Sequence, residues 1–224
     1  MELYPGIVVT RTSTAEQIAD GLTRMIMSGA IAPGTKVKET VIAASMGISR
    51  NTVREAVRLL EQGGLVRHKM YKGTVVVEPS TEEARELYAA RSVLELAAVR
   101  VPIIGEQLER IEAEFQRLQE LCEVDPPVES QEIVAQDLAF HAAIVATLGS
   151  QRINELYTQV AKELRFYLMV LSHDESPAHV AKEHEEILEH IRAGDLDGAV
   201  REVAEHNSRN GANVERLIAS RGGS

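Results

Sequence analysis

The chain has 224 residues, of which 44% are hydrophobic and 26% charged, and its formal net charge is −10. These proportions are ordinary for a globular protein, and the length allows one large domain or two small ones. No apolar run is long enough to cross a bilayer, no signal peptide opens the sequence, and the single cysteine, Cys122, excludes an internal disulfide. We therefore expect a cytoplasmic protein with no membrane partner, and not a disulfide-stabilised secreted one.

The net charge is distributed unevenly along the chain. Residues 1–78 contain 10 Lys and Arg against 7 Asp and Glu, whereas residues 79–224 contain 14 against 27. The first part is therefore slightly basic and the second strongly acidic. A basic first part can approach phosphate groups even though the whole chain is acidic.

Three helices are predicted in the first part of the chain. Ser13 and Glu16 have the spacing of a capping box, which predicts a helix that begins directly after Ser13. A second, short helix is predicted over 39–46. Ser49 can cap a third helix over 50–62.

The third predicted helix has two distinct faces. Its apolar residues recur at the spacing of a buried face: Val53, Ala56, Val57 and Leu60. Arg50, Arg54 and Arg58 lie four residues apart and form a separate stripe. Guanidinium groups on a helix in the major groove can contact guanine O6 and N7 in pairs. Arg50 and Arg54 are therefore candidate base-reading residues; the alternative is an ordinary solvated helix face.

Two short strands are predicted at 65–69 and 74–77, on either side of a four-residue turn. Two short helices, a basic helix and a hairpin follow one another in the order of a winged helix-turn-helix. The hairpin's candidate DNA contacts are Lys69 and Lys72 for phosphates, and Tyr71 and Gly73 for close approach to the backbone or minor groove.

Motifs across residues 13–80 resemble the signature of the GntR family of transcription regulators. They are Ala32-Pro33-Gly34, Glu39, Gly47-Ile48-Ser49-Arg50, Val53-Arg54-Glu55-Ala56-Val57, Leu60-Glu61, Gly64-Leu65-Val66 and Gly73. The resemblance implies a domain that binds an operator in double-stranded DNA, with base contacts from Arg50 and Arg54 and neighbouring contacts from Ser49, Asn51 and Thr52. The sequence departs from the family at Asn51-Thr52, where many members have Thr-Pro, and this concerns the detailed base preference.

From Thr81 onward the pattern is helical only. Helices are predicted near 82–101, 105–123, 130–148, 151–171, 177–193 and 196–219. The expected fold is mainly α. It comprises an N-terminal winged helix-turn-helix with a small β-hairpin wing at 8–78, a linker at 79–81 and a C-terminal six-helix antiparallel bundle at 82–220.

One carboxylate and three histidines in the second part could form a metal site. Asp137 and His141 lie four residues apart on one helix face, and His184 and His206 lie on the last two helices. Side chains of these types from three helices can surround a divalent transition metal. The alternative is that they are hydrogen-bonded core residues. The remaining histidines of this part are predicted to be solvated: His173, His179 and His190.

Three short segments around these residues resemble the ligand segments of the FCD domain, the helical effector domain of FadR-type GntR regulators. They are Asp137-Leu138-Ala139-Phe140-His141, Glu183-His184-Glu185-Glu186-Ile187 and Glu205-His206. The resemblance implies that Asp137, His141, His184 and His206 hold one divalent ion, with zinc, nickel and manganese all compatible. The number of helices resembles that of the VanR-like group.

Two arginines are candidates for binding an effector. Arg91 lies in a segment, Tyr88 to Glu95, that resembles the family's first effector-domain helix, where the arginine tends to point toward the ligand cavity. Arg165 is a second candidate. An inward arginine suits a carboxylate ligand. The alternative for Arg91 is an ordinary ion pair with Glu95.

These features together predict a transcription regulator, and not an enzyme, whose operator binding is controlled by a small carboxylate metabolite at the metal. A short palindromic operator implies a homodimer. One alternative is a metal-responsive regulator, or a structural metal, without an organic effector. A less favoured alternative is a metal-dependent hydrolase, although no carboxylate is obviously placed as a general base.

Overall fold

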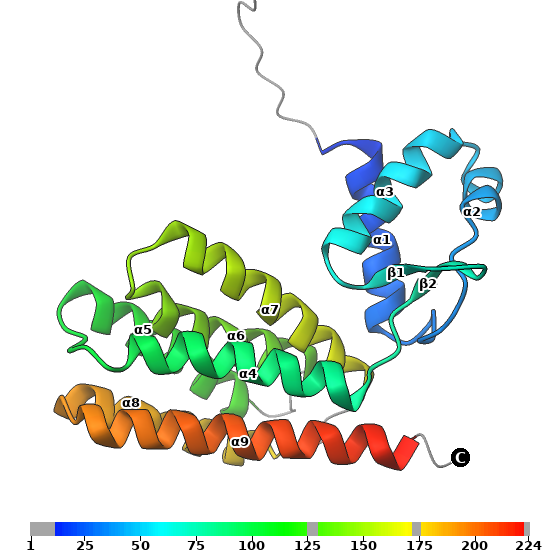
Figure 1. Cartoon of the computed structure of the whole chain (residues 1–224). Helices are drawn as coiled ribbons and strands as arrows, with labels where there is room; N and C mark the ends of the chain where they lie inside the picture. Colours follow the sequence, from blue (N-terminus) through cyan, green and yellow to red (C-terminus); the bar gives the residue numbers. More distant parts are fainter. Residues whose placement is uncertain (1–11, 125–129, 172–175, 222–224) are drawn as a thin grey trace, which may run out of the picture. The chain divides into compact units, whose positions relative to one another are not determined.

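The computed structural model describes residues 12–124, 130–171 and 176–221, and it divides into two compact units between Val77 and Glu78 (Figure 1). Residues 8–11 of the predicted DNA-binding domain and the predicted solvation of His173 lie outside the described residues. Among the described helices, none is both long and apolar enough to cross a membrane.

The first unit has the predicted order of three helices and a hairpin. Its elements are α1 (Thr14–Met27), α2 (Glu39–Met46), α3 (Arg50–Gln62), β1 (Val66–Lys69) and β2 (Gly73–Val76). The predicted capping box is present: Ser13 N donates to Glu16 Oε2 at 2.6 Å, and Ser13 Oγ accepts from Glu16 N at 3.2 Å. The apolar face predicted for α3 is buried at Val53, Ala56, Val57 and Leu60.

The hairpin has a third extended segment beside it. Lys36 pairs with Val75 in an antiparallel bridge, and Val37 N donates to Thr74 O at 2.9 Å. This segment is not predicted from the sequence, because four residues between a turn and a helix are too few to show an alternating pattern. The bridge ties the connection between α1 and α2 to the wing.

The described residues of the second unit form six helices. These are α4 (Thr81–Ala98), α5 (Glu106–Glu123), α6 (Ser130–Ala146), α7 (Gln151–Val170), α8 (Pro177–Ala193) and α9 (Leu196–Arg221). The helices pack in the closed order α4, α9, α8, α5, α6, α7 and back to α4, and α4 also packs against α6. The predicted fold class, a winged helix-turn-helix and a six-helix bundle, is therefore confirmed (Figure 1).

The interior of this bundle is apolar in one part and polar in another. Phe115, Phe140, Ile144 and Ile187 belong to an apolar cluster drawn from α4, α5, α6, α8 and α9. Elsewhere the same helices bury charged and polar side chains: Arg91, Glu95, His141, Glu183, His184, His206, Asn207 and Asn210. Buried polar groups are costly unless they are paired, so this polar group of residues is the candidate site in the bundle.

Candidate functional site

The exposed start of α3 is fixed by its N-cap residue. Ser49 Oγ accepts a hydrogen bond from Thr52 N at 3.1 Å and lies 2.8 Å from Thr52 Oγ1. The cap satisfies an amide that a helix leaves free in its first turn. Arg50 and Asn51 are exposed directly after it, as a helix that enters a groove by its N-terminal residues requires.

Arg54 lies one turn further along α3, with its side chain 52% exposed. Its Nε atom is 3.6 Å from Glu39 Oε2 at the start of α2, a contact that the sequence did not reveal. An exposed ion pair of this kind contributes little free energy, so the guanidinium can exchange it for a base edge. Arg58, a turn later, pairs with Glu55 at 3.3 Å within α3.

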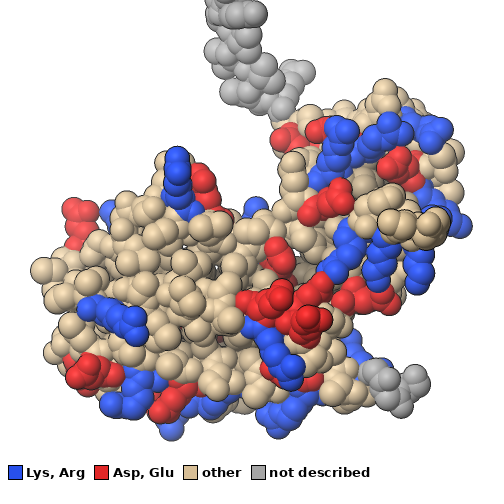
Figure 2. All heavy atoms as spheres, in the orientation of Figure 1, with Lys and Arg blue, Asp and Glu red and all other residues tan. Residues whose placement is uncertain are grey.

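The turn of the wing projects its side chains into solvent. Tyr71 is 97% exposed and has a positive φ of 64°, and Lys72 is exposed beside it. Gly73, with φ of 78°, begins β2 opposite Lys69, and a Cβ atom there would lie 3.4 Å from Lys36 Cε. In Figure 2 the visible face of this unit carries more Lys and Arg than Asp and Glu. Contact between these residues and DNA remains a prediction.

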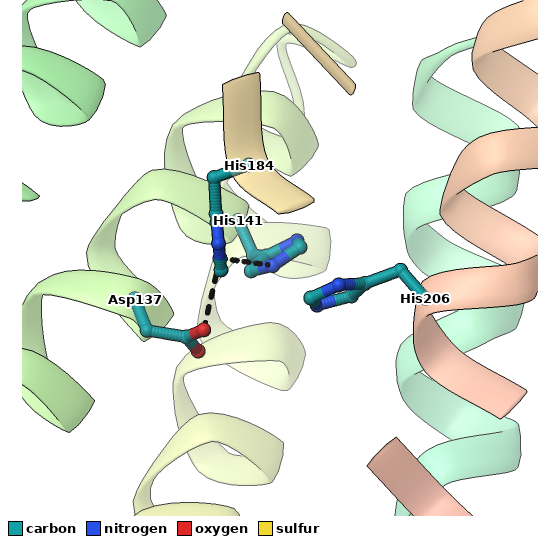
Figure 3. Close-up of side chains that lie close together, drawn as sticks. All are labelled: Asp137, His141, His184 and His206. Atoms are coloured by element: carbon teal, nitrogen blue, oxygen red, sulfur yellow. Dashed lines mark hydrogen bonds and ion pairs between the residues drawn. The ribbon is translucent and has the colours of Figure 1, made fainter. Parts of the chain in front are cut away.

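The four predicted metal ligands converge in the second unit (Figure 3). Asp137 and His141 come from α6, His184 from α8 and His206 from α9, and one ligand atom from each lies within 4.8 Å of the others. All three histidines are at most 1% exposed. His184 Nε2 lies 2.9 Å from Asp137 Oδ1 and 3.1 Å from His141 Nε2.

The second ring nitrogen of each histidine faces an acceptor. His184 Nδ1 lies 2.7 Å from Val180 O, His141 Nδ1 lies 3.3 Å from Glu95 Oε2, and His206 Nδ1 lies 3.2 Å from Glu183 Oε2. Of these three nitrogens, His141 Nδ1 is at ion-pair distance without hydrogen-bond alignment. A proton on each outward Nδ1 leaves the inward Nε2 with a lone pair, and that of His206 faces Asn210 Nδ2 at 3.1 Å.

This tautomer makes the cluster suitable for a cation. The Nε2 lone pairs of His141 and His184 then face each other at 3.1 Å, beside a carboxylate oxygen of Asp137. Such atoms repel one another unless a positive charge lies among them. Histidine ligands whose other nitrogen is held by a carboxylate or a carbonyl are typical of metal sites. The residues present therefore fit a divalent transition metal.

The electrostatics agree with neutral His141 and His206 beside ionised carboxylates. Burial, reinforced by Arg91, lowers the pKa of His141 to about 3, and burial also lowers the pKa of His206. Burial by itself raises the pKa of Asp137, but His184 more than offsets this, so that the pKa of Asp137 is well below its ordinary value. Metal ligation needs a neutral imidazole and an ionised carboxylate.

Arg91 forms the buried ion pair that the sequence left as an alternative. Its Nε donates to Glu95 Oε1 at 2.7 Å, with both side chains at most 1% exposed, and its Nη2 lies 3.5 Å from His206 Nε2. Burial acts to lower the pKa of Arg91, but the Glu95 carboxylate dominates and raises it, so the guanidinium stays charged. Arg91 is thus both paired with Glu95 and directed at the cluster.

Glu95 is the residue that joins the site to the rest of the bundle. Tyr157 OH on α7 donates to Glu95 Oε1 at 2.6 Å, and Asn207 Nδ2 on α9 donates to Glu95 Oε2 at 2.9 Å. With Arg91 and His141, these contacts link four helices through one carboxylate. The sequence analysis named Glu95 only as a partner for Arg91, because contacts between distant segments leave no periodic signal.

Glu183 holds a similar place at the other side of the cluster. Its Oε2 faces His206, and its Oε1 lies 3.1 Å from Arg209 Nε and 3.3 Å from His179 Nε2. Burial acts to raise its pKa, but the hydrogen bond to His206 and the nearby cations lower it to about 2. In the sequence, the only indication of a role for Glu183 is its position directly before His184.

Two further sequence expectations have definite positions. Arg165 is exposed on α7 between buried Leu164 and Phe166, so the structure does not bring it into the cluster, and the expectation that it reaches inward is corrected. Helical geometry explains this, since adjacent positions point about 100° apart. His179 is 57% exposed, whereas His190 is only 33% exposed and lies 2.9 Å from Asp195 Oδ2, so it is less solvated than expected.

Comparisons with known families match both units. A family model described as "Bacterial regulatory proteins, gntR family" matches residues 14–76, and the FCD domain model matches residues 86–209. "Uncharacterized HTH-type transcriptional regulator YdhC" of Bacillus subtilis (strain 168) is 26% identical over 205 residues, covering 90% of this chain and 91% of that protein. The "Gluconate operon transcriptional repressor" of the same organism is 27% identical over 169 residues, covering 75% of this chain and 69% of that protein.

Solved structures show the same arrangement of elements. "The crystal structure of a putative transcriptional regulator GntR from Rhodococcus sp. RHA1" is 30% identical, covers 91% of this chain and 98% of that one, and has a TM-score of 0.73. A structure described as "Metal-free FCD domain of TM0439 a putative transcriptional regulator" covers 64% of this chain and 99% of that one. Its TM-score is 0.52 and its identity 20%, so this likeness concerns the fold alone.

Proposed function

The chain belongs to the GntR family of bacterial regulatory proteins and carries an FCD domain, and from this premise we propose that a divalent metal ion and an organic acid in its helical unit control operator binding. DNA-binding transcription regulation follows from the family itself, whose members are regulators and not enzymes. The observation that carries the rest is the convergence of Asp137, His141, His184 and His206 on one point.

The charges around the cluster favour an anionic ligand once a metal is bound. Asp137 and Glu95 are ionised and Arg91 is positive, while the ionised Glu183 is paired with Arg209, so one excess negative charge is left in the bundle interior. A divalent ion changes this to one excess positive charge. Uncompensated buried charge is costly, so a carboxylate that enters beside Arg91 and the metal would be stabilised. The metal would supply a Lewis-acid contact for that carboxylate.

The proposed effector is a small organic acid because a carboxylate satisfies these charges. The named role of one relative agrees with this class, since gluconate is a hydroxy acid and that relative regulates a gluconate operon. Elemental analysis would identify the metal bound by this chain. The thermal-shift screen and operator titrations would identify the acid and the sign of regulation.

The site lies on the helix that follows directly from the DNA-binding unit in the sequence. Arg91 and Glu95 are both on α4, whose first residue, Thr81, comes four residues after Val77. At the start of α4, Tyr167 OH donates to Glu83 Oε2 at 2.7 Å and accepts from Ser80 N at 3.4 Å. We propose that ligand binding repacks α4 and α7 and thereby alters DNA binding, with a coupling of about 1–3 kcal/mol.

The metal site is tested by elemental analysis of purified wild type and His184→Ala. Wild type should contain one divalent ion per chain and His184→Ala much less, with a lower melting temperature because a ligand of the folded state is lost. His190→Ala is the matched control, since this histidine is on the same helix and contacts Asp195 outside the cluster. Equal metal content in wild type and His184→Ala would overturn the site.

The effector is tested by titrating operator DNA in the presence of metabolic acids. A thermal-shift screen on metal-loaded protein should first identify an acid that raises the melting temperature. That acid should change the operator affinity of wild type, whereas His184→Ala should bind the operator but not respond. A response to metal alone would support a metal-responsive regulator, and no response to either would support a structural metal.

Sedimentation without DNA should show the dimer that a two-fold operator requires.

A further inference from the structure

The outward face of α4 is not covered by any other described part of the chain. The inward side of this helix buries Ala84, Tyr88, Arg91, Glu95 and Ala98 against its neighbours α7 and α9. The exposed residues share one stripe, because residues three and four apart lie on the same side of a helix. They are Glu82, Glu86, Ala89, Val93 and Ala97, followed by Arg100 in the turn after α4, and Arg85 is exposed at the edge of this stripe. Val93, at the middle, is an apolar side chain that is 68% exposed.

Between Glu86 and Arg100 the order of residues along this stripe is symmetric about Val93. Ala89 lies four residues before Val93 and Ala97 four residues after it. Glu86 lies seven residues before and Arg100 seven residues after. If a second copy of the helix runs antiparallel to the first, each alanine lies opposite an alanine of that copy, and the acidic end lies opposite the basic end.

The two charges at the ends of the stripe have no ion-pair partner within the described residues. Arg85, directly beside Glu86, binds Glu215 at 2.6 Å, and Arg91 binds Glu95, but Glu86 and Arg100 pair with neither of these nor with any other described group. In Figure 2, tan surface occupies the middle of the region where α4 runs in Figure 1. The stripe therefore has an apolar centre between unpaired charges of opposite sign.

We infer that α4 is a contact between two copies of this chain, packed antiparallel on a two-fold axis that passes through Val93. This inference rests on the homodimer of the proposed function and identifies the face that forms it. On such an axis Val93 meets Val93 of the partner subunit, the alanines allow the two backbones to approach, and Glu86 faces Arg100 of the partner subunit. An isologous contact requires this self-complementarity. Parallel packing would instead place like charges together.

The register is tested with cysteines introduced in a Cys122→Ser background. A residue on a two-fold axis lies beside its own copy, so Val93→Cys should form an intermolecular disulfide in high yield under mild oxidation. Ala89→Cys is the matched control on the same stripe. Its two copies would lie roughly 12 Å apart along the helices, because each residue rises about 1.5 Å, which is too far for a disulfide. The double variant Ala89→Cys/Ala97→Cys should crosslink again.

The antiparallel orientation of the two helices is tested by charge reversal. Sedimentation measures the dimer dissociation constant of each variant. Arg100→Glu or Glu86→Arg should each weaken the dimer by roughly tenfold, since each replaces two attractions by two repulsions in the symmetric contact. The double variant Glu86→Arg/Arg100→Glu should restore the dimer. Arg117→Glu, an exposed change on α5, is the control and should have no effect.

The outcomes separate this inference from the proposed function. A dimer in which Val93→Cys fails to crosslink, or in which the double charge variant is no better than the single ones, would show that α4 is not the contact while the proposed dimer stands. A wild-type chain that sediments as a monomer at micromolar concentration would contradict both. Crosslinking of Ala89→Cys instead of Val93→Cys would place the axis elsewhere and overturn the register.

Discussion

Each histidine of the cluster depends on a second residue that holds its outer ring nitrogen, and for His206 that residue is Glu183. The carboxylate lies 3.2 Å from His206 Nδ1 and fixes the tautomer that leaves Nε2 free for a metal. Glu183→Gln removes the negative charge but keeps the size of the side chain. We expect metal affinity to fall by about 10- to 100-fold, the range typical for loss of such an orienting group.

Competition titrations with a fluorescent chelator would measure this change. Glu202→Gln is the control, because Glu202 also contacts Arg209, at 3.4 Å, but touches no histidine of the cluster. Its metal affinity should equal that of wild type. If Glu202→Gln and Glu183→Gln lose the same affinity, the effect comes from Arg209 and the orienting role is wrong.

Arg50 and Arg54 should read bases, whereas Lys72 should contact phosphates. Arg50→Ala or Arg54→Ala should each cost about 1–3 kcal/mol of specific binding if each makes a paired guanine contact. Lys72→Ala should weaken binding to all sequences evenly. Anisotropy titrations on the operator and on random DNA separate the two effects, with Arg58→Ala as the control further along α3. Arg50→Ala that binds the operator as tightly as wild type would contradict the assignment.

The sequence pointed to the residues of the cluster but not to their supports. Asp137 and His141 share a helix face at i and i+4, and short motifs placed His184 and His206 beside them. Glu95 could not be identified in the same way, because its partners come from α6, α7 and α9 and only the folded bundle brings them together. Arg165 does not point inward, because it lies on the exposed side of α7 between buried Leu164 and Phe166.

At the scale of elements, local signals located most helices within a few residues. The capping box at Ser13, the glycine after α2 and the proline at the start of α8 mark ends that agree with the structure. Helix α4 ends at Ala98, three residues earlier than expected, since Pro102 disfavours helical geometry in the residue before it. The bridge of Lys36 to Val75 was missed because pairing of so short a segment depends on tertiary contact.

The cap of α3 provides a prediction that separates stability from DNA binding. Ser49→Ala should lower the free energy of unfolding by about 1 kcal/mol, because the hydrogen bond to Thr52 N is lost. Ser49→Asp can still accept that bond and its charge suits a helix N-terminus, so stability should be retained. The same charge repels phosphates, so Ser49→Asp should weaken DNA binding.

Urea unfolding and gel-shift titrations on these two variants would give the two quantities separately. The control is Ser28→Ala, at the C-terminal end of α1, which should leave both unchanged within a few tenths of a kcal/mol. A stable Ser49→Asp protein that binds the operator like wild type would show that the start of α3 does not approach the DNA backbone.

Over the whole molecule, the metal-free bundle holds two histidines that cannot readily take up a proton. Burial and Arg91 lower the pKa of His141 to about 3, and burial lowers the pKa of His206, whereas a histidine in the unfolded chain has a pKa near 6.5. Below pH 6.5 the unfolded chain therefore binds protons that the folded chain does not. The resulting stability is fully present above pH 6.5 and is lost as the pH falls toward the folded-state values.

We therefore expect the free energy of unfolding of chelator-treated protein to decrease as the pH falls from 7.5 to 5.5. The slope below pH 6.5 can reach about 1.4 kcal/mol per pH unit for each of the two histidines. The pKa values of Glu95 and Asp137 are lowered, so the stability that these carboxylates provide is lost only below about pH 4.5. They therefore do not affect the change in unfolding free energy between pH 7.5 and 5.5. Urea unfolding at several pH values measures the slope. His206→Gln removes one of the two groups and should make it shallower, while stability that is flat or rises on acidification would contradict neutral, buried histidines.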